Sequence, residues 1–131
     1  MLKLILVISI LSATLFARPP FLSQGLIPHY TKKIAKNWDN DFLELTAKQK
    51  PQLLAIREET MHELGKLKKL LEPLEQELAK RIVAGEKPQE LSNLVDRIAK
   101  YKSQATMVHL KCVYKTQKVL TSEQLDLLPS L

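Results

Sequence analysis

The 131-residue chain contains one cysteine, three glycines and few aromatic residues. Because a lone cysteine, Cys112, cannot form a disulfide within the chain, the fold must rest on packing alone. The sequence has no phosphate-cradling glycine loop, and no serine or cysteine nucleophile stands in a pattern with a histidine and an acid. These absences argue against an enzyme, and we expect a protein that acts by binding.

The chain also lacks an apolar run long enough to cross a bilayer, which takes about 20 residues. Its longest apolar and small-residue run extends from Leu4 to Phe16, after Lys3 and before Ala17. This order is typical of a secretory signal peptide. We therefore expect residues 1–17 to be a cleavable signal, the mature protein to be exported, and no stable membrane insertion.

Positive charge exceeds negative charge: the formal net charge is +6, and loss of Lys3 with the signal leaves +5. A basic surface favours anionic partners. Nucleic acid is a poor candidate, because an exported protein does not routinely meet it and no basic motif interleaved with aromatic residues is present. Anionic lipid or acidic patches on other proteins fit the charge better.

What the sequence does contain is helical periodicity. Leucine, lysine, glutamate and glutamine dominate residues 47–128, a composition that favours helix over strand. Apolar residues at alternating spacings of three and four form two seams, the pattern of packed helices. The first seam consists of Leu64, Leu67, Leu71, Leu74 and Leu78, and the second of Leu91, Leu94, Ile98, Tyr101, Ala105, Val108 and Cys112.

A short glycine-containing turn at residues 84–88 separates the seams, which predicts an antiparallel hairpin. Pro73 lacks the amide that would bond the carbonyl of Lys69, so we expect a kink near residues 69–73. Ahead of the hairpin, Ile27, Tyr30, Ile34 and Trp38 are spaced by three or four and predict a short amphipathic helix that ends within residues 37–40. The expected fold is all-α: a long kinked antiparallel hairpin (46–128) with short flanking helices, preceded by an N-terminal segment (18–45).

A five-residue pattern, Leu-Thr-x-x-Gln, occurs twice, each time where a helical run begins. Its chemistry is that of a capping box, in which the threonine hydroxyl and the glutamine side chain satisfy backbone amides at the start of a helix. One such box is most simply a helix start; two that bracket a hairpin are harder to dismiss. The copies consist of Leu45, Thr46 and Gln49, and of Leu120, Thr121 and Gln124.

Residues 28–128 resemble the periplasmic LTxxQ proteins, which include the Spy and CpxP stress chaperones and related heavy-metal-resistance and sensor proteins. The resemblance rests on the two motifs, on the hairpin between the motifs, and on the export signal that precedes them. The resemblance implies a curved helical homodimer and an ATP-independent chaperone that shields unfolding envelope proteins, or a stress or metal sensor that reports to a partner such as a sensor kinase. The chain departs from the family in having Gly65 inside the first helix, Pro51 close behind the first motif, and no histidine-dense stretch.

Two groups of residues are candidates for binding sites. The first group contains five residues of types that bind zinc or copper, and Met61 lies near them along the hairpin. They could form a metal site if they converged, although their heptad positions do not obviously bring them together. The alternative is a buried free cysteine with a partly exposed histidine and methionines that fill gaps. The five metal candidates are His29, His62, Met107, His109 and Cys112.

Basic and apolar residues on both hairpin helices could instead form an amphiphilic surface for unfolded clients, in which charge speeds capture and apolar contacts retain the client. The alternative for each lysine alone is a solvated face. The candidate client-binding residues are Lys48, Lys50, Leu53, Leu54, Met61, Arg97, Lys100, Lys111 and Lys115.

Three functions therefore follow from the sequence. The leading one is a Spy/CpxP-like periplasmic chaperone or envelope-stress regulator that requires no cofactor. The second is a periplasmic heavy-metal sensor or resistance protein that binds a transition metal. The third is a structural coiled-coil adaptor with one fixed partner.

Overall fold

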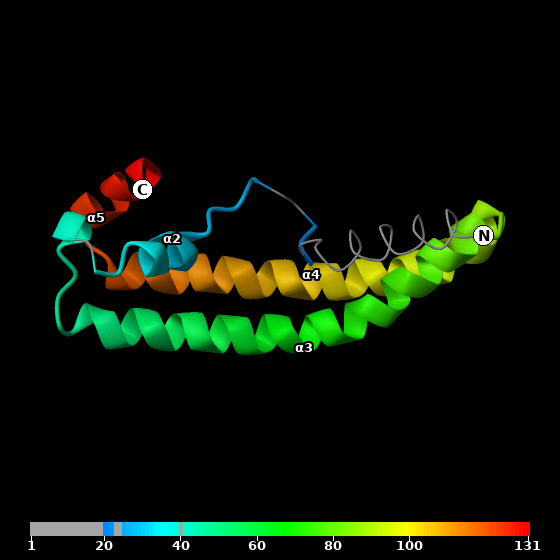
Figure 1. Cartoon of the computed structure of the whole chain (residues 1–131), viewed down its shortest axis with the longest axis horizontal. Coiled ribbons are helices and arrows are strands. Elements are labelled where there is room, and N and C mark those ends of the chain that lie inside the picture. Colours follow the sequence, from blue (N-terminus) through cyan, green and yellow to red (C-terminus); the bar gives the residue numbers. More distant parts are fainter. Residues whose placement is uncertain (1–19, 23–24, 40) are drawn as a thin grey trace, which may run out of the picture. The chain divides into compact units, whose positions relative to one another are not determined.

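The computed structural model describes residues 20–22, 25–39 and 41–131. The signal peptide expected at residues 1–17 lies outside these residues. Within them the chain is helical and contains no strand, as predicted. Figure 1 shows the long helices α3 and α4 lying side by side as a hairpin. The elements are α2 (Tyr30–Lys36), η1 (Asp41–Leu43), α3 (Gln49–Val83), α4 (Pro88–Val119), α5 (Ser122–Leu127) and η2 (Leu128–Ser130).

The two long helices, α3 and α4, pack against each other as the predicted hairpin. Most seam residues are buried: Leu71 is 2% exposed, Leu94 4% and Ala105 0%. Pro73 lies inside α3, which continues as an α-helix on both sides of it. The described residues form two compact units, which we call the turn unit (residues 20–22 and Gly65–Thr106) and the base unit (residues 25–64 and Met107–Leu131).

The turn unit has a small leucine-rich core. Leu71 and Leu74 of α3 pack with Leu94 and Ile98 of α4, and Leu78 and Tyr101 complete the cluster. Because the two helices contribute matching apolar positions at the same spacing, the seam closes without any buried polar side chain.

Gly85 ends α3 in a Schellman motif. The amide of Glu86 donates to the carbonyl of Arg81 at 3.3 Å, and the amide of Gly85 donates to that of Ile82 at 3.1 Å. Gly85 has φ +77°, a left-handed conformation that glycine adopts without steric cost. Pro88 then begins α4, where its missing amide costs no hydrogen bond.

The base unit has a second core, built from four helical elements around the open end of the hairpin. Ile34 of α2 and Leu128 of η2 are 1% and 0% exposed. Tyr30 and Trp38 pack on this core. Helix α2 is shorter than the spacing predicted, because it ends at Lys36 with Asn37 as its cap, and Ile27 and Trp38 lie outside it. The buried core residues are Ile34, Leu43, Leu53, Leu120 and Leu128.

Candidate functional site

Both Leu-Thr-x-x-Gln motifs form capping boxes in the base unit. At the first, the Thr46 hydroxyl accepts from the amide of Gln49 at 3.1 Å, and the amide of Thr46 donates to Gln49 Oε1 at 3.0 Å. At the second, the matching distances for Thr121 and Gln124 are 3.2 and 3.0 Å. Each box therefore satisfies two amides that a helix start leaves without a partner.

The two glutamines also bind each other. Gln49 Nε2 donates to Gln124 Oε1 at 2.8 Å, and Gln124 Nε2 donates back to Gln49 Oε1 at 3.1 Å. Each amide nitrogen makes one more bond, from Gln49 to the Val119 carbonyl at 3.0 Å and from Gln124 to the Leu43 carbonyl at 2.9 Å. Since both side chains are buried, this reciprocal pair fixes the start of α3 against the start of α5.

A second polar cluster joins the segment before α2 to α4. The rings of His29 and His109 are stacked, with centroids 4.2 Å apart and an interplanar angle of 23°. His109 Nε2 lies 3.1 Å from the carbonyl oxygen of Pro28, and one turn farther along α4 the Sγ of Cys112 lies 3.6 Å from the hydroxyl of Thr31. His109 is 5% exposed, so this histidine is buried rather than partly exposed.

Both histidines favour the neutral form. Burial, followed by the positive charge of Lys32, lowers the pKa of His29. Burial also lowers the pKa of His109, His29 lowers it further, and the bond to Pro28 opposes the change. A stacked pair of neutral imidazoles avoids the repulsion that two cations would experience at this distance.

The metal-ligand candidates are only partly brought together. His29, His109 and Cys112 lie in one region, but the described residues contain no group of three or more His, Cys, Asp or Glu side chains arranged to hold a metal ion. His62 is exposed, as its outward heptad position predicts. Met61 and Met107 are each 52% exposed, so the alternative in which methionines fill gaps in the core does not apply to them.

An apolar groove lies between α2 and α3. It encloses about 190 Å³, and Arg57 is the only charged residue among the described residues that line it. Beside it, Lys50 Nζ lies 5.9 Å from the centre of the Trp38 ring. The lining residues are Thr31, Ile34, Ala35, Trp38, Leu53, Leu54 and Arg57.

A more polar hollow of similar size lies between α3 and α4 in the base unit, with Cys112 among its lining residues. Lys115 Nζ bonds Glu59 Oε2 at 2.6 Å there. This bond is the main reason that the pKa of Glu59 is lowered, and the charges of Lys115 and Lys111 add to it. Lys115 is thereby engaged within the protein.

An exposed apolar stripe runs along α4 on the side away from the seam. Met107, Leu110 and Tyr114 are 52%, 41% and 61% exposed, and their spacings of three and four place them on one helix face. Lys111 is exposed, and Lys118 Nζ lies 5.2 Å from the centre of the Tyr114 ring. The sequence from residue 97 to residue 120 contains no acidic residue. We call this surface the α4 stripe.

The candidate client-binding residues are divided between the two units. Leu53 is 2% exposed and belongs to the core, because α2 covers it. The prediction that Leu53 contributes to a client-binding surface was therefore wrong. Leu54 and Met61 remain about half exposed, and Lys48 is exposed. Arg97 and Lys100 are exposed in the turn unit, whereas the other candidates, Lys48, Lys50, Leu54, Met61, Lys111 and Lys115, belong to the base unit.

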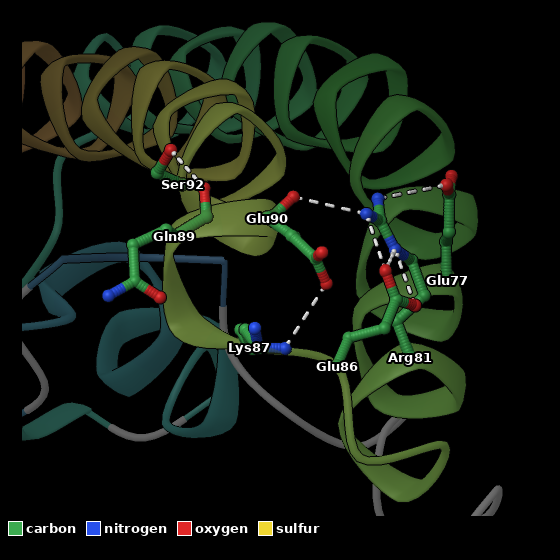
Figure 2. A network of polar contacts seen from close by, with 7 residues as sticks. All are labelled: Glu77, Arg81, Glu86, Lys87, Gln89, Glu90 and Ser92. Carbon is green, nitrogen blue, oxygen red and sulfur yellow. Dashed lines mark hydrogen bonds and ion pairs between the residues drawn. The ribbon is translucent and has the colours of Figure 1, made fainter.

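The hairpin turn carries a partly exposed ionic network, shown in Figure 2. Arg81 Nε lies 2.9 Å from both carboxylate oxygens of Glu86, and an Arg81 terminal nitrogen donates to the Glu90 carbonyl at 3.1 Å. Glu77 lies 3.7 Å from Arg81, and Glu90 accepts from the Lys87 amide at the start of α4. The bonds to Arg81 lower the pKa of Glu86, and Glu86 raises that of Arg81.

Comparison of the chain with protein-family models, curated proteins and solved structures found no match. Among the described residues, no helix is both long and apolar enough to span a bilayer.

Three features of the base unit were not predicted from the sequence: the glutamine pair, the histidine stack and the groove. Each joins residues far apart in the chain, for example Gln49 with Gln124. The repeated motif was the only signal, since two identical capping boxes each leave a glutamine NH₂ group that still needs a partner. Nothing in the local pattern of His29 or His109 indicates stacking.

Proposed function

We propose that the protein is an ATP-independent chaperone of the bacterial envelope that binds partly unfolded polypeptides reversibly. The observation that carries the proposal is the α4 stripe. Three large apolar side chains stand about half exposed on one helix face beside Lys111 and Lys118. Exposed apolar patches on soluble proteins typically mark sites of interaction.

The chemistry of the stripe suits clients of many sequences. Methionine is unbranched and adaptable, which is useful where one surface must fit different partners. Lysine side chains can lie along apolar surface while their charges attract acidic segments. The stripe therefore offers weak and adaptable contacts rather than one rigid pocket.

The paired capping boxes add support through the resemblance to LTxxQ proteins. In this chain the motif residues act as a unit, because Gln49 and Gln124 bind each other as well as their own threonines. On the same resemblance we propose a periplasmic location, export by a cleavable signal and a homodimer.

The test is light scattering from an unrelated protein that aggregates on heating, with and without the purified protein, in the presence of chelator. We expect suppression without ATP. The triple variant M107Q/L110Q/Y114Q should need about tenfold more protein for the same suppression, which corresponds to about 1.4 kcal/mol of lost binding. Glutamine preserves helix propensity, so the fold should remain.

The matched control is I82Q/V83Q, which removes two exposed apolar side chains from the turn unit, 57% and 77% exposed. It should suppress aggregation like the wild type. Equal loss in both variants would show that exposed apolar surface acts without regard to place. Absence of suppression by the wild-type protein would overturn the proposed function.

Metal sensing is the second candidate, favoured by the proximity of His29, His109 and Cys112 in the base unit. The stacked rings would have to reorient for their nitrogens to converge on one ion. Titration with zinc and with copper, followed by thermal unfolding, tests it. A rise in melting temperature that His109→Gln removes and exposed His62→Gln leaves intact would support metal binding.

The third function, a structural adaptor with one fixed partner, makes a contrasting prediction in the scattering assay. Suppression with several unrelated aggregating proteins would exclude it.

A further inference from the structure

The groove between α2 and α3 has the size of a single side chain. Small-molecule pockets typically enclose about 300–1,000 Å³. At about 190 Å³ the groove is too small for a drug-sized ligand or a lipid chain, but it can take one large aliphatic or aromatic side chain. Its walls suit such a guest, since Ile34, Trp38 and Leu54 line it.

The rim of the groove is cationic. Lys50, Leu54 and Arg57 are spaced by four and three residues on α3, so they share one helix face. Arg57 lines the groove, Lys50 lies over the Trp38 ring, and no acidic residue is among the lining residues. A guanidinium in this position can bind a carboxylate through two parallel hydrogen bonds.

We propose that this groove binds a polypeptide segment in which one large apolar side chain stands next to an aspartate or glutamate. The apolar side chain enters between Trp38 and Leu54, and the neighbouring carboxylate pairs with Arg57. That the segment belongs to an unfolding client rests on the proposed function. The match of apolar guest and acidic neighbour rests on the groove itself.

The chain carries its own reporter for this site, because Trp38 is its only tryptophan. Three short Gly/Ser peptides serve as probes: one with a phenylalanine between two aspartates, one with lysines in place of the aspartates, and one with serine in place of the phenylalanine. We expect saturable change of Trp38 fluorescence with the first peptide. The other two should bind at least about tenfold more weakly, a difference of about 1.4 kcal/mol.

Two variants of groove residues test the assignment. Arg57→Gln should weaken binding of the acidic peptide about tenfold but should not weaken binding of the lysine peptide, because the guanidinium attracts a carboxylate and repels a lysine. Ala35→Leu should abolish binding of the acidic peptide by filling the groove. Matched controls are Lys68→Gln and Ala99→Leu, both at exposed helix positions in the turn unit. Circular dichroism confirms that each variant is folded.

Equal binding of the acidic and lysine peptides, or unchanged binding by Ala35→Leu, would overturn the proposal. So would self-association of the wild type that the acidic peptide disperses, because the occupant would then be a second copy. The scattering assay separates the two claims. Suppression of aggregation without peptide binding would contradict the proposed peptide site and support the chaperone function. Selective peptide binding without suppression would contradict the chaperone function and support the groove as a peptide site.

Discussion

The turn unit and the base unit use the same hairpin helices but are stabilised differently. Leucine and isoleucine form the core of the turn unit, and its ionic network around Arg81 and Glu86 lies outside that core and is partly exposed. In the base unit, four polar residues are buried beside the apolar core: Gln49, His109, Thr116 and Gln124. All four buried polar residues of the described chain thus lie in the unit that also contains the histidine stack, the groove and the α4 stripe.

The difference shows what each kind of interaction specifies. An apolar seam packs well but tolerates other partners of similar volume. A buried polar group must meet its own partner, because leaving it without one is costly. The base unit must arrange four short elements around the end of a hairpin, and the reciprocal bonds of Gln49 and Gln124 select one arrangement.

The largest expected effect comes from breaking the glutamine pair. Gln124→Ala removes the side-chain half of a capping box. It leaves the Thr121 amide, the Leu43 carbonyl and one N–H of the Gln49 side chain without their partner. We expect the free energy of unfolding to fall by about 3 kcal/mol. Urea unfolding followed by Trp38 fluorescence measures it.

The matched experiment is the double-mutant cycle with Gln49→Ala. Because the two side chains bind each other, the double variant should lose about 1–2 kcal/mol less than the sum of the single variants. Strict additivity would mean that each glutamine acts only through its own box, and the contrast between the units would weaken.

A smaller effect is expected at the glycines of the turn unit, where the backbone alone decides the outcome. No atom lies within 4 Å of an added Cβ at Gly65 or Gly85. Gly85→Ala should lower the free energy of unfolding by about 1–2 kcal/mol, because φ is +77° there.

Gly65→Ala should have the opposite sign and raise stability by about 0.5–1 kcal/mol, since Gly65 lies inside α3. Thermal unfolding monitored by circular dichroism compares the two variants. Destabilisation by Gly65→Ala would show that this position needs a glycine for a contact outside the isolated chain.

The smallest effect is the pH dependence of the base unit. The pKa of buried His109 is below its usual value of 6.5, so the unfolded chain binds a proton more readily than the folded chain. The free energy of unfolding therefore rises with pH between the folded-state pKa and about 6.5. The contribution of His109 to stability is lost as the pH falls through that window.

His109→Gln should flatten this dependence, whereas the exposed His62→Gln should leave it unchanged. The measurement is urea unfolding at a series of pH values in chelator. An unchanged slope in His109→Gln would assign the dependence to another group.

The long helices could be predicted because their signals are local. Leu71, Leu74, Leu94 and Ile98 occupy periodic positions, and the structure places them in one cluster. The turn at Gly85 was predicted for the same reason, since a glycine and a following proline leave few other conformations. The position of Ile34 in the core follows from the amphipathic spacing of α2.

The candidate sites were less predictable because they depend on which short element covers which helix. Leu53 and Leu54 are neighbours of the same type, yet α2 buries the first and leaves the second 47% exposed at the groove. His109 differs little in sequence context from an exposed helical histidine such as His62. Its burial depends on the Pro28 and His29 segment lying over α4.

By itself, the sequence determined the helices, their apolar seams, the turn and the two capping boxes. Each of these depends on residues within a few turns of one another, where spacing and backbone preference suffice. Only the tertiary structure decided that Gln49 binds Gln124, that His29 stacks on His109, and that a groove opens beside Arg57. These contacts join elements that lie far apart in the sequence. The packing of the whole base unit therefore selects among the partners that local chemistry allows.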